Sequence, residues 1–528
     1  MYEKEVLRRR AFAIIAHPDA GKTTLTEKLL LYSGAIHLAG HVRAKKERRK
    51  TRSDWMTLEQ ERGISISTAA MQFVSQGYVV NLLDTPGHQD FSEDTYRTLM
   101  AVDSAVMVLD AARGVEPQTI KLFHICRERK IPIFTFINKM DLPALDPFAL
   151  LDNIESVLKI EAVPLCWPMG SGRDFKGFYD LERKQVHSFE KSVTSAYPAC
   201  EQITGLDDPR LQEIMGEEIY RSFREGVEIA SSALPPFDYE KFLRGEQTPV
   251  FFGSALTNFG VEHLLKEFLR LSPSPQRVIT EDGKIIEPAS EKFSAFVFKL
   301  QANMNKAHRD RVAFVRILSG RFERGMSVFV PRLNKEIKLT SPVAFFGQER
   351  NTIDEAYAGD IIGLINPGLY RLGDLLCTGE PFLYNPLPRF APELFARLIL
   401  QDTSKAKQFR KAIHELSEEG VIQLFNIYEQ TPIVGVVGQL QFDVLLYRLQ
   451  DEYAVPARLE SLPFQVSRWT HEKHKEKFSR YDMLVYDSEG NLVVLFENEF
   501  RLKSFQEKYP EVELFSHPPQ LALAAGRK

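Results

Sequence analysis

A lysine flanked by glycine and threonine near the N-terminus has the residue types that bind a polyphosphate. In a loop of this kind, backbone N–H groups and a helix N-terminus surround the phosphates. The lysine reaches the β- and γ-phosphates, and the hydroxyl that follows it binds Mg²⁺. The pattern therefore predicts a nucleotide-binding loop, with Lys22 also assisting catalysis and Thr23 as a metal ligand, in the segment Ala16-His17-Pro18-Asp19-Ala20-Gly21-Lys22-Thr23-Thr24. Ala16 stands where the strict pattern has its first glycine, so a surface turn containing Gly-Lys-Thr remains an alternative at this point.

A second group of chemically suited residues follows the apolar run 78–83. An acidic residue at the carboxyl end of a parallel strand can hold Mg²⁺ through water, and a nearby glycine allows a backbone N–H to approach a γ-phosphate. A histidine beside such a turn would orient the attacking water, although a structural histidine is the alternative. The pattern predicts metal binding by Asp84 and catalysis by His88 in the nucleotide-binding segment Asp84-Thr85-Pro86-Gly87-His88.

Two further segments are suited to recognition of the base. A carboxylate accepts hydrogen bonds from guanine N1–H and the exocyclic amine, and adenine offers no such pair, so Asp141 would select GTP over ATP. Asn138 would contact the base and the phosphate loop, and the stem of Lys139 would cover the ring. Backbone N–H groups of the segment 254–256 would donate hydrogen bonds to guanine O6. The predicted nucleotide-binding residues here are Asn138-Lys139-Met140-Asp141 and Ser254-Ala255-Leu256.

Each of these motifs follows an apolar run that reads as a buried strand. The runs 11–15, 78–83, 131–137 and 249–252 precede the motifs, and 105–109 has the same character. Polar turns at the ends of successive strands indicate a doubly wound, mostly parallel α/β sheet with its ligand at the carboxyl ends of the strands. We expect this P-loop domain to span residues 1–280. An internal insertion at about 142–248, with helical runs at 147–159 and 210–232, is too long for an unstructured loop.

Short alternating runs follow the α/β domain. They predict a β-barrel domain at 290–385. A C-terminal α+β domain is expected at 388–528, with a strand at 433–437 and a helix that buries Phe442, Leu445, Leu446 and Leu449. Glu418 and Glu419 resemble paired catalytic carboxylates, but no base or metal ligand accompanies them, so we expect a solvated helix end. The tail 517–528 is expected to be frayed.

Composition limits the alternatives. The chain has 528 residues and a formal net charge of −4. Its four cysteines are scattered along the sequence, and this spacing argues against a zinc site or a disulfide framework. The net charge gives no general case for nucleic-acid binding, so any such contact must come from local patches, and the run 43–52 is strongly basic. No apolar run is long enough to span a membrane, and the first residues lack a signal-peptide pattern. We expect a monomeric cytoplasmic protein that contacts neither membrane nor DNA.

Together, these motifs resemble those of the ribosome-dependent translational GTPases. The similarity lies in Ala-His-Pro-Asp-Ala-Gly-Lys-Thr-Thr, Glu-Arg-Gly-Ile-Ser-Ile, Asp-Thr-Pro-Gly-His and Asn-Lys-Met-Asp. Further segments resemble the bacterial class II release factors of that family, so that the similarity covers nearly the whole chain. These segments are 53–56, 162–170, 175–177, 308–314, 416–420 and 439–444.

The resemblance implies a function and further site residues. Ser65 occupies the position of the family's Mg²⁺-binding threonine, and Ile64 and Pro18 occupy positions that gate access of His88 to water. The cofactors would be GTP or GDP and Mg²⁺, and the partners both ribosomal subunits, including ribosomal RNA. GTP hydrolysis would promote dissociation of a class I peptide chain release factor after peptide release. The rivals are a translocase like elongation factor G and a small-molecule P-loop kinase or ATPase.

Overall fold

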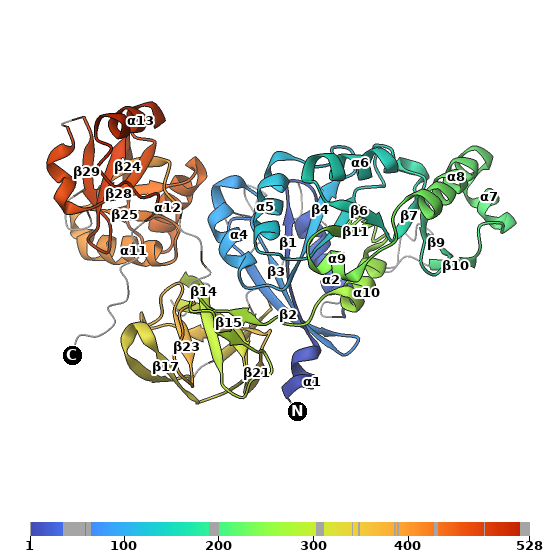
Figure 1. Cartoon of the computed structure of the whole chain (residues 1–528), viewed down its shortest axis with the longest axis horizontal. Helices are drawn as coiled ribbons and strands as arrows, with labels where there is room; N and C mark the ends of the chain where they lie inside the picture. The colour runs from blue at the N-terminus through green and yellow to red at the C-terminus, as the bar shows by residue number, and fades with distance from the viewer. Residues whose placement is uncertain are drawn as a thin grey trace.

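The computed structural model contains three bodies, in blue to green, yellow, and orange to red along the chain (Figure 1). The residues that it describes are 2–34, 59, 65–189, 200–302, 311–340, 342–346, 349–384, 387, 390–426, 431–479 and 481–517. The basic run 43–52, the gating residue Ile64 and the tail from 518 onward lie outside these residues.

The main sheet of the N-terminal body confirms the doubly wound fold. Its order is β2-β3-β1-β4-β5-β11-β6, and all neighbours are parallel except the β2–β3 pair. Every residue of β1, β4, β5 and β11 is buried, which explains why these strands are apolar almost throughout. The strands are β1 Arg9–Ala16, β2 Ala69–Ser75, β3 Tyr78–Asp84, β4 Ser104–Asp110, β5 Ile133–Asn138, β6 Glu161–Pro164 and β11 Gln247–Phe252.

The helices of this body start and stop at residues suited to those positions. Asp146 accepts hydrogen bonds from two N–H groups of the first turn of α6, and Pro147 takes the first helical position. Helix α2 ends at Ser33 and Gly34, and Gly34 has a left-handed φ of 77°. The helices are α1 Tyr2–Leu7, α2 Lys22–Tyr32, η1 Gln89–Phe91, α4 Ser92–Leu99, α5 Pro117–Glu128, α6 Pro147–Leu158, α9 Tyr239–Leu243 and α10 Val261–Leu271.

Within the expected insertion, α6 and β6 extend the main fold, and a separate four-stranded sheet follows, ordered β10-β9-β8-β7. The helical run expected at 210–232 is two helices, because Gly216 between them has a φ of 78°. The helices α7 and α8 lie at the end of the molecule away from the C-terminal domain (Figure 1). The elements are β7 Cys166–Met169, β8 Gly177–Asp180, β9 Gln185–Phe189, β10 Cys200–Thr204, α7 Pro209–Met215 and α8 Glu217–Ala233.

A buried histidine makes the stability of this region depend on pH. His263 of α10 packs against Phe178 and Phe251 and lies 4.0 Å from the Asp180 carboxylate. Burial holds the pKa of His263 below its ordinary value, although Asp180 acts in the opposite direction. The unfolded imidazole therefore binds a proton at a pH where the folded one does not, and the folded state is disfavoured as pH falls below the unfolded pKa.

Between about pH 6.5 and about pH 4, we expect the free energy of unfolding to fall by about 1.4 kcal/mol per pH unit because of His263, whose folded pKa is about 4. Replacing His263 by phenylalanine should remove this contribution and flatten the slope. Denaturant unfolding of the natural chain and of His263→Phe at several pH values tests this. Two parallel stability profiles would contradict it.

The second body is the β-rich domain expected from the alternating pattern. Its sheet runs β18-β17-β23-β14-β15-β22-β19, with β20 beside β19, and β19 also pairs with β2 of the N-terminal body. Its core contains Phe293, Val297, Val315, Ile317 and Leu376. The strands are β14 Ser294–Ala302, β15 Arg311–Ser319, β16 Arg321–Glu323, β17 Ser327–Val330, β18 Lys335–Lys338, β19 Pro342–Phe346, β20 Glu349–Thr352, β21 Glu355–Tyr357, β22 Ile361–Ile365 and β23 Leu375–Cys377, after the β12 Val278–Ile279 and β13 Ile285–Ile286 hairpin.

The C-terminal domain contains two antiparallel sheets. One is ordered β25-β26-β24-β27 and the other β28-β30-β29. Phe442, Leu445 and Leu449 of α12 are buried in the core of the first sheet, and Leu446 packs against that core, as the sequence pattern predicted. The elements are β24 Leu394–Leu400, α11 Ala406–Glu418, β25 Gln423–Phe425, β26 Ile433–Val436, α12 Gln439–Asp451, β27 Ala457–Leu462, β28 Val466–Thr470, β29 Met483–Tyr486, β30 Leu492–Phe496 and α13 Glu499–Lys508.

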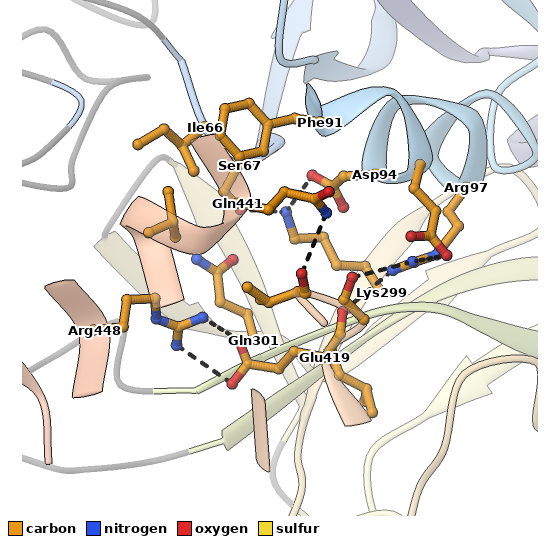
Figure 2. Close-up of a pocket in the computed structure, with 15 residues that line it drawn as sticks. Ile66, Ser67, Phe91, Asp94, Arg97, Lys299, Gln301, Glu419, Gln441 and Arg448 are labelled. Atoms are coloured by element: carbon orange, nitrogen blue, oxygen red, sulfur yellow. Dashed lines mark hydrogen bonds and ion pairs between the residues drawn. The ribbon is translucent and has the colours of Figure 1, made fainter. Parts of the chain in front are cut away.

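Glu418 and Glu419 are not the solvated helix end that the sequence suggested. The carboxylate of Glu419 is buried at the junction of the three bodies, where it pairs with Arg448 at 2.8 Å (Figure 2). It also accepts a hydrogen bond from the Ala302 N–H. Burial raises its pKa, although Arg448 acts in the opposite direction. Glu418 forms an ion pair with Arg311, with its Oε2 2.5 Å from the Arg311 Nη2. The sequence prediction was wrong because these partners lie far away in the chain, where no local pattern shows them.

Cys126, Cys166 and Cys377 are free and buried, consistent with their expected place in the core. Among the residues described, no helix has both the length and the apolar character needed to cross a membrane.

Candidate functional site

The phosphate loop connects β1 to α2 through a tight turn. Ala16 ends β1, and Lys22 begins α2. The Ala20 N–H donates to the His17 carbonyl at 3.3 Å. Two residues have left-handed backbone conformations, Asp19 with φ of 65° and Gly21 with φ of 95°. These residues redirect the chain from the strand into the helix, so that the N-terminus of α2 lies directly behind the loop. His17 lies 3.5 Å from Glu116, at the start of α5.

Lys22 and Asp84 meet across the carboxyl edge of the sheet. The Lys22 Nζ lies 2.5 Å from the Asp84 Oδ1, and both side chains are buried. The other carboxylate oxygen, Oδ2, is buried and has no hydrogen-bond partner among the residues that the structure describes. A buried acceptor oxygen is costly unless a donor or a cation satisfies it. Asp84 Oδ2 is thus suited to contact a bound cation or its water.

The hydroxyls of Thr23 and Ser65 lie 3.5 Å apart. The segment that carries Ser65 is positioned by Glu59, whose carboxylate accepts hydrogen bonds from the N–H groups of Ile66 and Ser67. Hydroxyl and carboxylate oxygens are the ligand atoms that Mg²⁺ prefers. Thr23, Ser65 and Asp84 therefore form a donor set that fits this ion.

Two threonine hydroxyls hold the turn after β3 in place, one within the turn and one from α4. Thr85 donates to the Ile14 carbonyl at 2.6 Å, and Thr95 donates to the Pro86 carbonyl at 3.1 Å. A Cβ on Gly87 would lie 3.6 Å from the Pro18 backbone, so that the turn lies against the phosphate loop. His88 follows at once and caps η1, because its Nδ1 accepts a hydrogen bond from the Asp90 N–H at 3.2 Å.

Asn138 joins the phosphate loop to the segment that follows β11. Its Nδ2 donates to the Ala20 carbonyl, and its Oδ1 accepts from the Ala255 N–H, both at 2.8 Å. A Cβ on Gly21 would collide with the Asn138 amide, so this position requires glycine both for its left-handed φ and for this approach. One side chain thus fixes two of the predicted nucleotide-binding segments relative to each other.

The residues after Asn138 form the part of the site that was predicted to contact the base. Lys139 has a φ of 68° and pairs with Asp110 at 2.8 Å, and Met140 is fully buried. Asp141 is half-buried, and no other described residue forms a hydrogen bond or ion pair with its carboxylate. The backbone of Ser254 forms an isolated antiparallel β-bridge with Phe259. The Leu256 side chain is 47% exposed. Asp141 is therefore available to a ligand.

Asp110, which pairs with Lys139, belongs to none of the motifs seen in the sequence. Burial raises the pKa of this carboxyl group, but hydrogen bonds from Lys139 and the Ala112 N–H outweigh burial and hold the pKa below its usual value. A signal existed, because Asp110 ends β4 and therefore lies at the same sheet edge as the other motifs.

Comparison with known families matches the three bodies one by one. Residues 7–274 match the elongation factor Tu GTP-binding domain, residues 292–379 match elongation factor G domain 2, and residues 384–506 match the C-terminal domain of class II release factor RF3. A peptide chain release factor 3 from Symbiobacterium thermophilum is 52% identical over 512 residues, which cover 96% of this chain and 97% of that protein. The chain belongs to the peptide chain release factor 3 family.

Other comparisons agree with the family. A peptide chain release factor 3 from Synechocystis is 49% identical over 528 residues, which cover 98% of this chain and 96% of that one. The crystal structure of a Thermus thermophilus protein aligns with 92% of this chain and 72% of its own with a TM-score of 0.71, and at 23% identity it shows the shared fold alone. As a release factor 3 family member, the chain is a guanine-nucleotide-binding GTPase of translation termination, which confirms the prediction and disfavours the translocase and kinase alternatives.

Proposed function

We propose that the loops at the carboxyl edge of the main sheet bind GTP in the roles that their residues suggest. The observation that carries this is the position of Asn138, which fastens the phosphate loop to the Ser254-Ala255-Leu256 segment. Residues 17–24 surround the phosphates, and residues 84–88 lie beside the γ-phosphate. The Asp141 carboxylate accepts hydrogen bonds from the guanine N1–H and exocyclic amine, and Lys139 and Met140 flank the Asp141 position. Backbone N–H groups of residues 254–256 donate to guanine O6.

Thr23, Ser65 and Asp84 would hold Mg²⁺. Asp84 Oδ2, which has no hydrogen-bond partner among the described residues, supports this assignment. The ion, when bound, neutralises charge on the phosphates. Lys22 stabilises the charge that develops on the transferring phosphoryl group, and His88 orients the attacking water. Both side chains are held by other residues, Lys22 by Asp84 and His88 by the backbone of Asp90.

The metal assignment makes a prediction about Ser65. Replacing Ser65 by alanine removes one oxygen ligand, so we expect the Mg²⁺ concentration for half-maximal GTP binding to rise by about tenfold. Ser65→Thr keeps the hydroxyl and serves as the matched control, with a titration close to that of the natural chain. Binding of a fluorescent GTP analogue titrated with Mg²⁺ measures both. A Ser65→Ala curve that overlays the natural one would refute the assignment.

For the cellular role, we propose that the GTP form acts on the ribosome, contacting both subunits and ribosomal RNA, and promotes dissociation of a class I peptide chain release factor after peptide release. Hydrolysis would then free the protein from the ribosome. The names of the relatives and the match of residues 384–506 to a release-factor domain support this. We place the protein in the cytoplasm as a monomer.

Stimulation by ribosomes tests this role against the translocase alternative. GTP hydrolysis is measured without ribosomes, with ribosomes stalled after peptide release, and with ribosomes awaiting translocation. We expect stimulation by post-release ribosomes and no movement of tRNA on the others. Catalysed translocation would overturn the proposed role, and displacement of GTP by equal ATP would overturn the base assignment.

A further inference from the structure

Helix α12 of the C-terminal domain begins without a capping side chain of its own. Its N-cap is Gly438, which has an extended backbone. Gln441, in the first turn, accepts hydrogen bonds from the N–H groups of Val437 and Gly438. The N–H groups of the first helical turn need other acceptors, which an N-cap serine, threonine or aspartate usually provides. Here another domain supplies the acceptor.

The capping carboxylate comes from Asp90, 350 residues earlier in the chain. Its Oδ2 accepts a hydrogen bond from the Leu440 N–H at 2.7 Å. A Cβ on Gly438 would collide with this carboxylate, and all three of its nearest atoms would belong to Asp90. Asp90 thus occupies the place of the missing N-cap side chain, where a negative charge is also favoured by the helix dipole.

Asp90 also contacts the proposed catalytic histidine. Its N–H donates to Nδ1 of His88, and its Oδ1 lies 3.3 Å from the same nitrogen. One buried residue therefore contacts His88 with its backbone and one carboxylate oxygen, and α12 with the other oxygen. Any displacement of α12 would therefore act on the turn that carries His88.

The surrounding junction adds further contacts between the same elements. Ile66 and Phe91 of the N-terminal body pack with Val444 of α12 in one apolar cluster. Beside it, Lys299 of β14 donates a hydrogen bond to the Asp94 carboxylate (Figure 2). Lys299 also donates to the Thr68 carbonyl, and Asp94 accepts hydrogen bonds from Thr68. These contacts hold the end of the segment carrying Ser65, the η1 turn and α12 together.

We propose that Asp90 is a positioning residue through which helix α12 of the C-terminal domain sets the orientation of His88 for GTP hydrolysis. The inference rests on the proposed role of His88. Loss of the cap contact misplaces the imidazole without removing any group that touches GTP, so it affects turnover and not nucleotide affinity.

Substitutions on the two sides of this contact test the proposal. In the full-length chain, we expect Asp90→Ala and Gly438→Ala each to lower the ribosome-stimulated kcat by about tenfold, because small misplacements of a reacting group are costly. The ribosome KM and the affinity for a fluorescent GDP analogue should stay within about twofold. Asp402→Ala is the matched control, because Asp402 caps η4 of the same domain by accepting from the Ser404 N–H. Its kcat should equal that of the natural chain.

A double-mutant cycle separates positioning from general damage. Once Asp90 is alanine, the methyl group at Gly438 has room, so the double variant should be no slower than Asp90→Ala alone. Asp90→Asn keeps an acceptor for Leu440 and should lose less activity, which keeps the test open if Gly438→Ala does not fold. Additive losses, or a normal kcat in Gly438→Ala, would overturn the proposal. If His88→Ala itself turns over normally, the catalytic assignment fails instead.

Discussion

A chain with His88 replaced by alanine should bind GTP normally and lose ribosome-stimulated hydrolysis by about 10²- to 10⁴-fold, the contribution of a positioned group that acts on the reacting water. The loss falls on turnover because the phosphate loop and the base-binding residues are untouched. His88 is only partly buried and caps a single short turn, η1, so its removal leaves the core intact.

Hydrolysis rates at saturating ribosomes, together with equilibrium binding of a fluorescent GTP analogue, measure the two effects separately. His124→Ala is the matched control, because His124 is an exposed histidine on α5 of the same domain. It should keep the natural rate. Equal rates for His88→Ala and the natural chain would show that His88 is structural, and an equal loss of affinity and turnover would show a role in nucleotide binding.

Replacing Asp141 by asparagine should produce the second large effect, a change of base specificity. The asparagine amide cannot accept both hydrogen bonds from guanine, so GTP affinity should fall by about 10²-fold or more. Xanthine carries a carbonyl where guanine has its amine, and the asparagine NH₂ can donate to it. The variant should therefore prefer xanthosine triphosphate to GTP.

Competition of GTP, ATP and xanthosine triphosphate against a fluorescent GDP analogue measures this change. Asp146→Asn is the control, since Asp146 lies five residues further along the chain and caps α6 without entering the site. Unchanged preference for GTP in Asp141→Asn would show that another group reads the base.

Local patterns were sufficient to predict most of the sheet and the edge at which the motifs meet. Apolar runs that end at Asp84 and Asn138 mark buried parallel strands, and the carboxyl ends of such strands necessarily meet at one edge. The stop of α2 at Ser33 and Gly34 was visible for a similar reason, because a left-handed glycine is a local signal.

The junction of the three bodies could not be predicted in this way. Glu419 looks like a surface residue until Arg448 and Ala302 are brought to it by the fold. Gly438 looks like an ordinary turn glycine, and nothing near it indicates that Asp90 will cap its helix. Contacts between distant segments leave no periodic pattern in the sequence, so the contacts between domains appear only in the structure.

The most direct test of the proposed function is the dissociation rate of a labelled class I release factor from ribosomes that have released their peptide. We predict that this protein with GTP accelerates dissociation strongly, and that the protein with GDP does not. Dissociation that is equally fast with GDP, or unchanged by the protein with GTP, would contradict the proposed role in recycling class I factors.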